Sequence, residues 1–170
     1  MKTSRSSIPH LAAACVIATS AAIGAPAWAA DPPDFTVEFP AGLACSSFAL
    51  RLELWECKGQ FRELKDKNGY LRALFAGTGN AFRLTNPTNN KSISAPASGA
   101  SQLIQTYLAD GSQVYTNRGH VLLIWFPSDI PAGPWTVLNS GRVVFSLSPA
   151  GVGTLKSMTG DSTDVCAALS

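Results

Sequence analysis

The fold class follows from the stretch Leu50-Arg51-Leu52-Glu53-Leu54-Trp55, in which leucines alternate with charged or aromatic side chains. Successive side chains of a β-strand point to opposite faces, so this period of two places the leucines together on one face, towards a core. Similar alternation recurs in short segments along the chain, at 35–39, 70–75, 81–84, 114–116, 121–126, 136–138 and 142–147. The pattern predicts an all-β protein, an antiparallel β-sandwich or barrel of about eight to ten short strands.

Turn-forming residues separate these segments. Asn68-Gly69 predicts a two-residue type I′ hairpin between 61–65 and 70–75, because both central positions of that turn need positive φ. Asp110-Gly111 predicts a second hairpin, and Asn86-Pro87-Thr88-Asn89-Asn90 predicts a longer turn. The alternation of strand and turn signals therefore favours an antiparallel arrangement.

Two further elements are predicted near the middle and the end of the chain. The run Val121-Leu122-Leu123-Ile124-Trp125-Phe126 is expected to form a strand buried on both faces, with an exposed adhesive strand as the alternative. Close to the C-terminus, Asp161, Ser162 or Asp164 is expected to cap a short helix that runs through Leu169.

The first 29 residues have the three parts of a secretory signal peptide. Lys2 and Arg5 supply the basic start, 11–23 the apolar run, and Ala25-Pro26-Ala27-Trp28-Ala29 the small-residue cleavage pattern. Lipidation at Cys15 is a weaker alternative because the apolar stretch before it is too short. We therefore expect cleavage after Ala29 and a single domain over 30–170, secreted or associated with the cell envelope.

The charge balance bears on the class of partner. Removal of Lys2 and Arg5 leaves eleven basic and eleven acidic side chains, so the mature chain is close to neutral. Nucleic-acid binders and proteins of anionic membrane surfaces generally concentrate basic charge. The composition therefore predicts no nucleic-acid partner, and no apolar run after residue 30 reaches membrane-spanning length.

Three cysteines remain after the predicted cleavage site, at Cys45, Cys57 and Cys166. If 47–56 forms one strand at ~3.3 Å per residue, Cys45 and Cys57 lie roughly 30 Å apart, far beyond the ~6 Å between the Cα atoms of a disulfide. Cys166 is then the partner of one of them. We favour Cys45–Cys166, which ties the first long strand to the chain's end and leaves Cys57 as a free thiol. A monomer is expected, with a dimer through Cys57 as the alternative.

Four segments carry a resemblance to known proteins. Residues 39–48, 84–92, 140–144 and 164–169 read FPAGLACSSF, LTNPTNNKS, SGRVV and DVCAAL. Together they resemble a group of secreted actinobacterial proteins of similar length and no established function. The resemblance implies a cysteine in the first and the last of these segments, in agreement with the favoured pairing, and it implies no catalytic residue.

Patterns for catalysis and metal binding are sparse. His120 is the only histidine after residue 30, and neither a nucleophile motif nor a full set of zinc ligands accompanies it. Glu53 and Glu56 point to opposite faces of a strand, so they do not form a glycosidase pair. Asp161 and Asp164 are interpreted as turn and cap residues rather than calcium ligands. We predict no catalytic residue, no metal and no cofactor.

The favoured binding surface is the proline-rich loop 127–134. Prolines restrict its backbone, and Ile130 with Trp135 would form an apolar contact surface, unless the loop only covers the core. Trp55 and Tyr115 are two further candidates for ligand contact. We expect an exported, non-enzymatic binding or interaction module for a protein, a glycan or a lipid.

Two alternative functions remain at this stage. One is a carboxylate-dependent hydrolase of envelope material, which requires two acidic side chains that converge in a pocket. The other is a lipid carrier, whose cavity would be lined by Leu50, Leu52, Leu54 and Phe145.

Overall fold

The computed structural model describes residues 31–95 and 101–170, so the predicted signal peptide, with Cys15, lies outside the described residues. The described part is all-β with one short C-terminal helix, as predicted. Its elements are β1 (Phe35–Phe39), β2 (Leu50–Trp55), β3 (Gly59–Lys65), β4 (Leu71–Gly77), β5 (Ala81–Thr85), β6 (Ser92–Ala95), β7 (Ser101–Tyr107), β8 (Gln113–Trp125), β9 (Trp135–Leu147), β10 (Gly153–Asp164) and α1 (Val165–Leu169).

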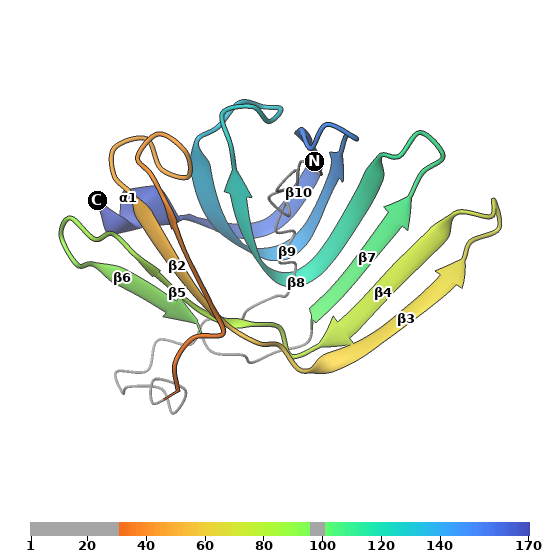
Figure 1. Cartoon of the computed structure of the whole chain (residues 1–170), viewed down its shortest axis with the longest axis horizontal. Coiled ribbons are helices and arrows are strands. Elements are labelled where there is room, and N and C mark those ends of the chain that lie inside the picture. The colour runs from red at the N-terminus through yellow and green to blue at the C-terminus, as the bar shows by residue number, and fades with distance from the viewer. Residues whose placement is uncertain (1–30, 96–100) are drawn as a thin grey trace, which may run out of the picture.

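The strands form two antiparallel sheets, in a sandwich-like arrangement. The small sheet has the order β1-β2-β5-β6, and the large sheet has the order β10-β9-β8-β7-β4-β3. Figure 1 shows the two sheets as diverging arms, with α1 beside the small sheet and β3 at the outer end of the large one. Strands β6, β7 and β10 were not among the predicted segments.

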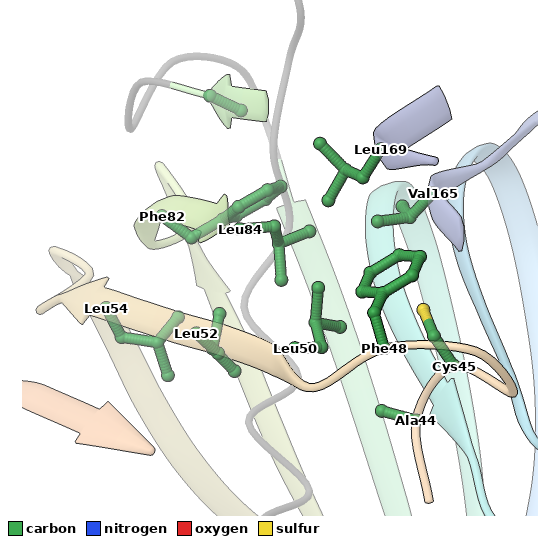
Figure 2. Close-up of a cluster of buried hydrophobic side chains, with 11 residues drawn as sticks. Ala44, Cys45, Phe48, Leu50, Leu52, Leu54, Phe82, Leu84, Val165 and Leu169 are labelled. Atoms are coloured by element: carbon green, nitrogen blue, oxygen red, sulfur yellow. The ribbon is translucent and has the colours of Figure 1, made fainter. Parts of the chain in front are cut away.

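The small sheet follows the alternation of its sequence. Leu50, Leu52 and Leu54 of β2 are buried, while the charged residues between them face outwards. They belong to a first core, which Figure 2 shows between the small sheet and α1. Its buried members are Ala44, Cys45, Phe48, Leu50, Leu52, Leu54, Phe82, Leu84, Ala95, Val165 and Leu169.

The apolar run of β8 separates this first core from a second one. Leu122 and Ile124 pack against the first core, whereas Val121, Leu123 and Trp125 belong to the second. Because neighbouring side chains of the strand point to opposite faces, one apolar run contributes to both cores. The predicted strand is present and covered on both faces, but it is fully buried on one face only, because Leu122 and Ile124 are partly buried.

A row of glycines bends the large sheet. Gly119, Gly141 and Gly160 lie side by side on the three long strands, and a Cβ atom on Gly141 would lie 2.0 Å from the carbonyl oxygen of Thr159. Backbones approach closely there because no side chain intervenes. The predicted separate strands 114–116 and 121–126 are therefore wrong: they are two halves of β8, just as 136–138 and 142–147 are two halves of β9.

The bend folds the ends of the long strands towards each other. Phe145 pairs with Tyr115 in the β8–β9 ladder, yet its ring lies 5.9 Å from that of Trp125, ten residues further along β8. The second core fills this fold and consists of Tyr115, Val121, Leu123, Trp125, Val143 and Phe145.

The two predicted hairpins are present, and the turn at Asn68-Gly69 is longer than expected. In the β3–β4 hairpin, the N–H of Gly69 donates to the carbonyl of Asp66 at 2.9 Å, and Gly69 has φ +83°. Gly111 has the same role between β7 and β8, with φ +82°. These are three-residue loops that need one positive φ, not two-residue type I′ turns that need two.

The C-terminus is fastened to the first core. The disulfide joins Cys45 to Cys166, with 5.5 Å between their Cα atoms, and Cys57 is a free thiol. Asp164 caps α1 by accepting a hydrogen bond from the N–H of Ala167. The other two cap candidates lie within β10 instead.

The turn between β5 and β6 holds the last residues of the chain. Asn86 and Asn89 both donate to the carbonyl of Leu169, each at 3.0 Å, and the ammonium group of Lys91 donates to the carbonyl of Ser170. Two of the segments that carry the resemblance, 84–92 and 164–169, therefore meet in space.

Candidate interaction surface

The proline-rich loop predicted as the binding surface is firmly attached to the large sheet. The buried carboxylate of Asp129 accepts hydrogen bonds from the N–H groups of Phe126 and Gly153, both at 2.7 Å. Ile130 forms a bridge with Thr154, and its side chain remains 58% exposed. The loop is thus fixed against the start of β10 and leaves the side chain of Ile130 accessible.

The four predicted contact residues do not form one surface. Trp55 is buried, with its N–H donating to the carbonyl of Asp31 at 3.0 Å. Tyr115 is buried against Phe145, and this burial raises the pKa of its hydroxyl. Trp135 is half-buried and stacks on Trp125. Of the four, Ile130 alone is largely accessible to a partner.

The residues considered for chemistry are also dispersed. His120 is half-buried, and desolvation lowers the pKa of its ring to about 4. Glu53 is engaged by Arg83 in an ion pair of 2.6 Å. Across 31–95 and 101–170, no three His, Cys, Asp or Glu side chains are grouped to hold a metal.

The side chains proposed to line a lipid cavity belong to different cores. Leu50, Leu52 and Leu54 are packed in the first core, whereas Phe145 lies in the second. These four residues therefore do not line a common cavity.

The hairpin formed by β3 and β4 differs from the rest of the described structure. Every residue of β3 is exposed. Phe61 is 61% exposed, Leu64 is 42% exposed and Leu71 is 36% exposed; with Ile130, these are the exposed large hydrophobic residues of the described part. Apolar surface gathered on one projecting element is typical of an interaction site.

The same hairpin concentrates the basic charge. Between Lys58 and Gly77 there are five basic and two acidic side chains, a net charge of +3. Because the chain after residue 30 is neutral in total, the remainder carries −3. The neutral total therefore conceals a basic segment. The basic residues are Lys58, Arg62, Lys65, Lys67 and Arg72.

The outer edge of β3 is open among the described residues, because β3 is the last strand of the large sheet. The N–H of Thr78 donates to the carbonyl of Lys58, and the N–H of Asp66 donates to the carbonyl of Tyr70. Hydrogen-bonded positions alternate along an antiparallel pair. Even-numbered residues of β3 therefore form backbone hydrogen bonds with β4, whereas the odd-numbered ones direct their N–H and C=O groups outwards, away from β4.

Local contacts hold the hairpin in one register. The carboxylate of Asp66 accepts hydrogen bonds from the N–H groups of Asn68 and Tyr70, at 2.8 and 3.1 Å, and pairs with Arg72 at 3.2 Å. At the other end, the ring of Phe75 covers Gly59, where an added Cβ would lie 2.3 Å from the ring. The exposed edge is thus presented on an ordered strand.

This surface was missed in the sequence because β3 lacks a consistent apolar face. Phe61 and Leu64 are three residues apart and point to opposite faces, so 59–65 has no half-buried alternation. The signal that was available is the density of basic residues between Lys58 and Arg72, which a net charge for the whole chain conceals.

Comparisons with protein-family models, with curated proteins and with solved structures found no match to this chain. Within the part of the chain that the structure describes, no helix has the length and apolar character needed to cross a membrane.

Proposed function

We propose that this protein is an exported, non-enzymatic binding module whose contact element is the β3–β4 hairpin. The observation that supports this proposal is the coincidence of exposed apolar side chains, basic charge and an open strand edge on one hairpin. Elsewhere in the described structure, exposed large apolar side chains are limited to Ile130.

The fold is suited to such a role because the hairpin lies outside both cores. Neither Phe61 nor Leu64 belongs to the first or the second core, and β4 is the strand that pairs with β3. Side chains there can be changed, or covered by a partner, with little effect on the sandwich. Binding elements carried on a rigid sheet scaffold commonly have this arrangement.

Export is part of the proposal. Its support is the signal-peptide pattern of the first 29 residues together with the Cys45–Cys166 disulfide, since disulfides persist mainly in oxidising compartments. Intact-mass analysis of protein recovered from the culture medium tests this part: a mass that begins near Ala30 is expected, and a retained leader would contradict it.

The binding role is tested with three probes, one for each ligand class. The secreted protein is measured against a displayed library of random peptides, a glycan array and phosphatidylglycerol vesicles. The test variant is Phe61→Ser/Leu64→Ser. The matched control is Ile130→Ser, which removes an equally exposed apolar side chain from the loop that sequence analysis favoured.

We expect at least one probe to bind the wild-type protein and to lose at least tenfold in affinity with the hairpin variant, while Ile130→Ser binds normally. A larger loss with Ile130→Ser would move the binding surface to the loop. Absence of binding to all three probes would overturn the proposal.

A further inference from the structure

We propose that the partner of the β3–β4 hairpin is an extended, acidic peptide segment that adds to the outer edge of β3 as a new strand. This inference rests on the proposed function and specifies both the partner and the mode of binding. Three properties of the hairpin support it: the direction of its backbone groups, the distribution of its charge, and the position of its apolar side chains.

The backbone of β3 is arranged to accept another strand. The odd-numbered residues Gly59, Phe61, Glu63 and Lys65 direct their N–H and C=O groups away from β4, as follows from the hydrogen bonds at the two ends of the hairpin. The backbone of an extended peptide offers a hydrogen-bonding partner to each of these outward N–H and C=O groups, which is the basis of binding by strand addition. Glycans and lipid headgroups have no regular series of N–H and C=O groups at the spacing of a β-strand.

The positive charge of the hairpin favours a negatively charged partner. A net charge of +3 between Lys58 and Gly77 attracts an acidic segment and speeds its encounter with the edge. The same charge disfavours a second copy of this chain, because two hairpins brought edge to edge would each contribute +3. Basic residues at a sheet edge are also a common protection against self-association.

The apolar side chains favour lateral docking over membrane insertion. Phe61 lies near the middle of β3, and β3 is exposed along its whole length. The turn, which a membrane-inserting hairpin would place in the lipid, carries Asp66, Lys67 and Asn68. A strand beside β3 would instead cover Phe61 on one face of the sheet and Leu64 on the other, so apolar residues are expected on both faces of the peptide.

The decisive variant is Glu63→Pro. The N–H of Glu63 points outwards, so proline removes no hydrogen bond of the β3–β4 ladder, but its ring blocks an incoming strand. Glu63→Gln is the matched control, because it changes the side chain and leaves the backbone donor in place. Phe61→Pro, compared with Phe61→Ser, repeats the backbone test at a second outward-facing position, because both variants lose the aromatic ring and only proline also removes the donor. Thermal unfolding of each variant verifies the fold.

The probe is a peptide selected from a displayed random library on the wild-type protein, with its affinity measured by fluorescence anisotropy. We expect acidic peptides, at least a tenfold loss of affinity with Glu63→Pro and with Phe61→Pro, and little change with Glu63→Gln. Affinity should fall several-fold as salt rises from low to physiological concentration, because screening weakens the attraction between exposed charges.

The outcomes separate this inference from the proposed function. Selected peptides that bind Glu63→Pro normally but fail with Phe61→Ser/Leu64→Ser would retain the hairpin as the binding site and overturn strand addition. Enrichment of basic or neutral peptides would overturn the acidic partner. Binding to phosphatidylglycerol vesicles, with no peptide enriched above background, would overturn the inference in favour of a membrane surface.

Discussion

Loss of the Cys45–Cys166 disulfide should reduce the stability of the fold by a large, calculable amount. The bond joins residues 121 positions apart. In the chain-entropy description, closing a loop of that length removes enough freedom from the unfolded chain to stabilise the native state by about 5 kcal/mol. Typical domains have a total stability of about 5–15 kcal/mol. For a domain of roughly 140 residues, such a loss lowers the Tm by about 15 °C.

The assay is thermal and urea unfolding of Cys45→Ala, Cys166→Ala and the double variant, with Cys57→Ala as the control. Both single variants remove the same bond, so the double variant should lose about as much stability as either one alone. Cys57→Ala should remain near the wild type, because Cys57 is a free thiol outside both cores. Additive losses in the double variant, or an equal loss with Cys57→Ala, would refute the reasoning.

Three other changes test the scaffold. Gly141→Ala should prevent folding or lower the urea midpoint severely, because its Cβ would lie 2.0 Å from the backbone oxygen of Thr159; a normal midpoint would show that the bend tolerates side chains. Asn86→Ala removes a buried donor to the carbonyl of Leu169 and should cost about 1–3 kcal/mol in urea unfolding. Burial lowers the pKa of His120 from 6.5 to about 4, so between these values the unfolded chain binds a proton that the folded protein does not. The contribution of His120 to the free energy of unfolding is therefore complete above about pH 6.5 and is lost as the pH falls towards 4. Because the ring is half-exposed we expect only about 1 kcal/mol, and His120→Gln should flatten the pH–stability curve in that window.

The sequence was most informative where one face of a strand is buried. The alternation of Leu50, Leu52 and Leu54 placed them correctly in a core, because every second side chain of a half-buried strand lies on the buried face. The favoured pairing of Cys45 with Cys166 was confirmed for a similar reason: a strand of known rise separates Cys45 from Cys57. Strand geometry excluded the Cys45–Cys57 pair, whereas the choice of Cys45 over Cys57 as the partner of Cys166 was a preference that the structure bears out.

The sequence was least informative where long-range pairing decides the structure. β10 is largely polar and contains Gly160, so its 12 residues have no strand signal of their own; they become a strand because β9 lies beside them. The glycine row also depends on the pairing of strands that are distant in the sequence. Gly119 and Gly141 interrupt the alternation of β8 and β9 and lie between the predicted segments. Only the pairing of the three long strands, which places them beside Gly160, shows that they form a bend.

The aromatic residues of the predicted site were misplaced for a related reason. Trp55 and Tyr115 were chosen because aromatic side chains are frequent in binding surfaces, but a large ring also fills a core efficiently. In this protein both rings are buried. Residue type alone does not distinguish a core aromatic side chain from one on a binding surface, and the strands that cover these two rings are distant in the sequence.

The segments that carry the resemblance contribute to the scaffold rather than to the hairpin. Cys45 lies in 39–48, Asn86 in 84–92, Gly141 in 140–144 and Cys166 in 164–169; these residues supply the disulfide, the contact with the C-terminus and the bend. None of these segments includes any part of 57–77. The features that fix the fold are thus separate in sequence from the surface proposed to bind, so substitutions in the hairpin leave the disulfide, the contact with the C-terminus and the bend in place.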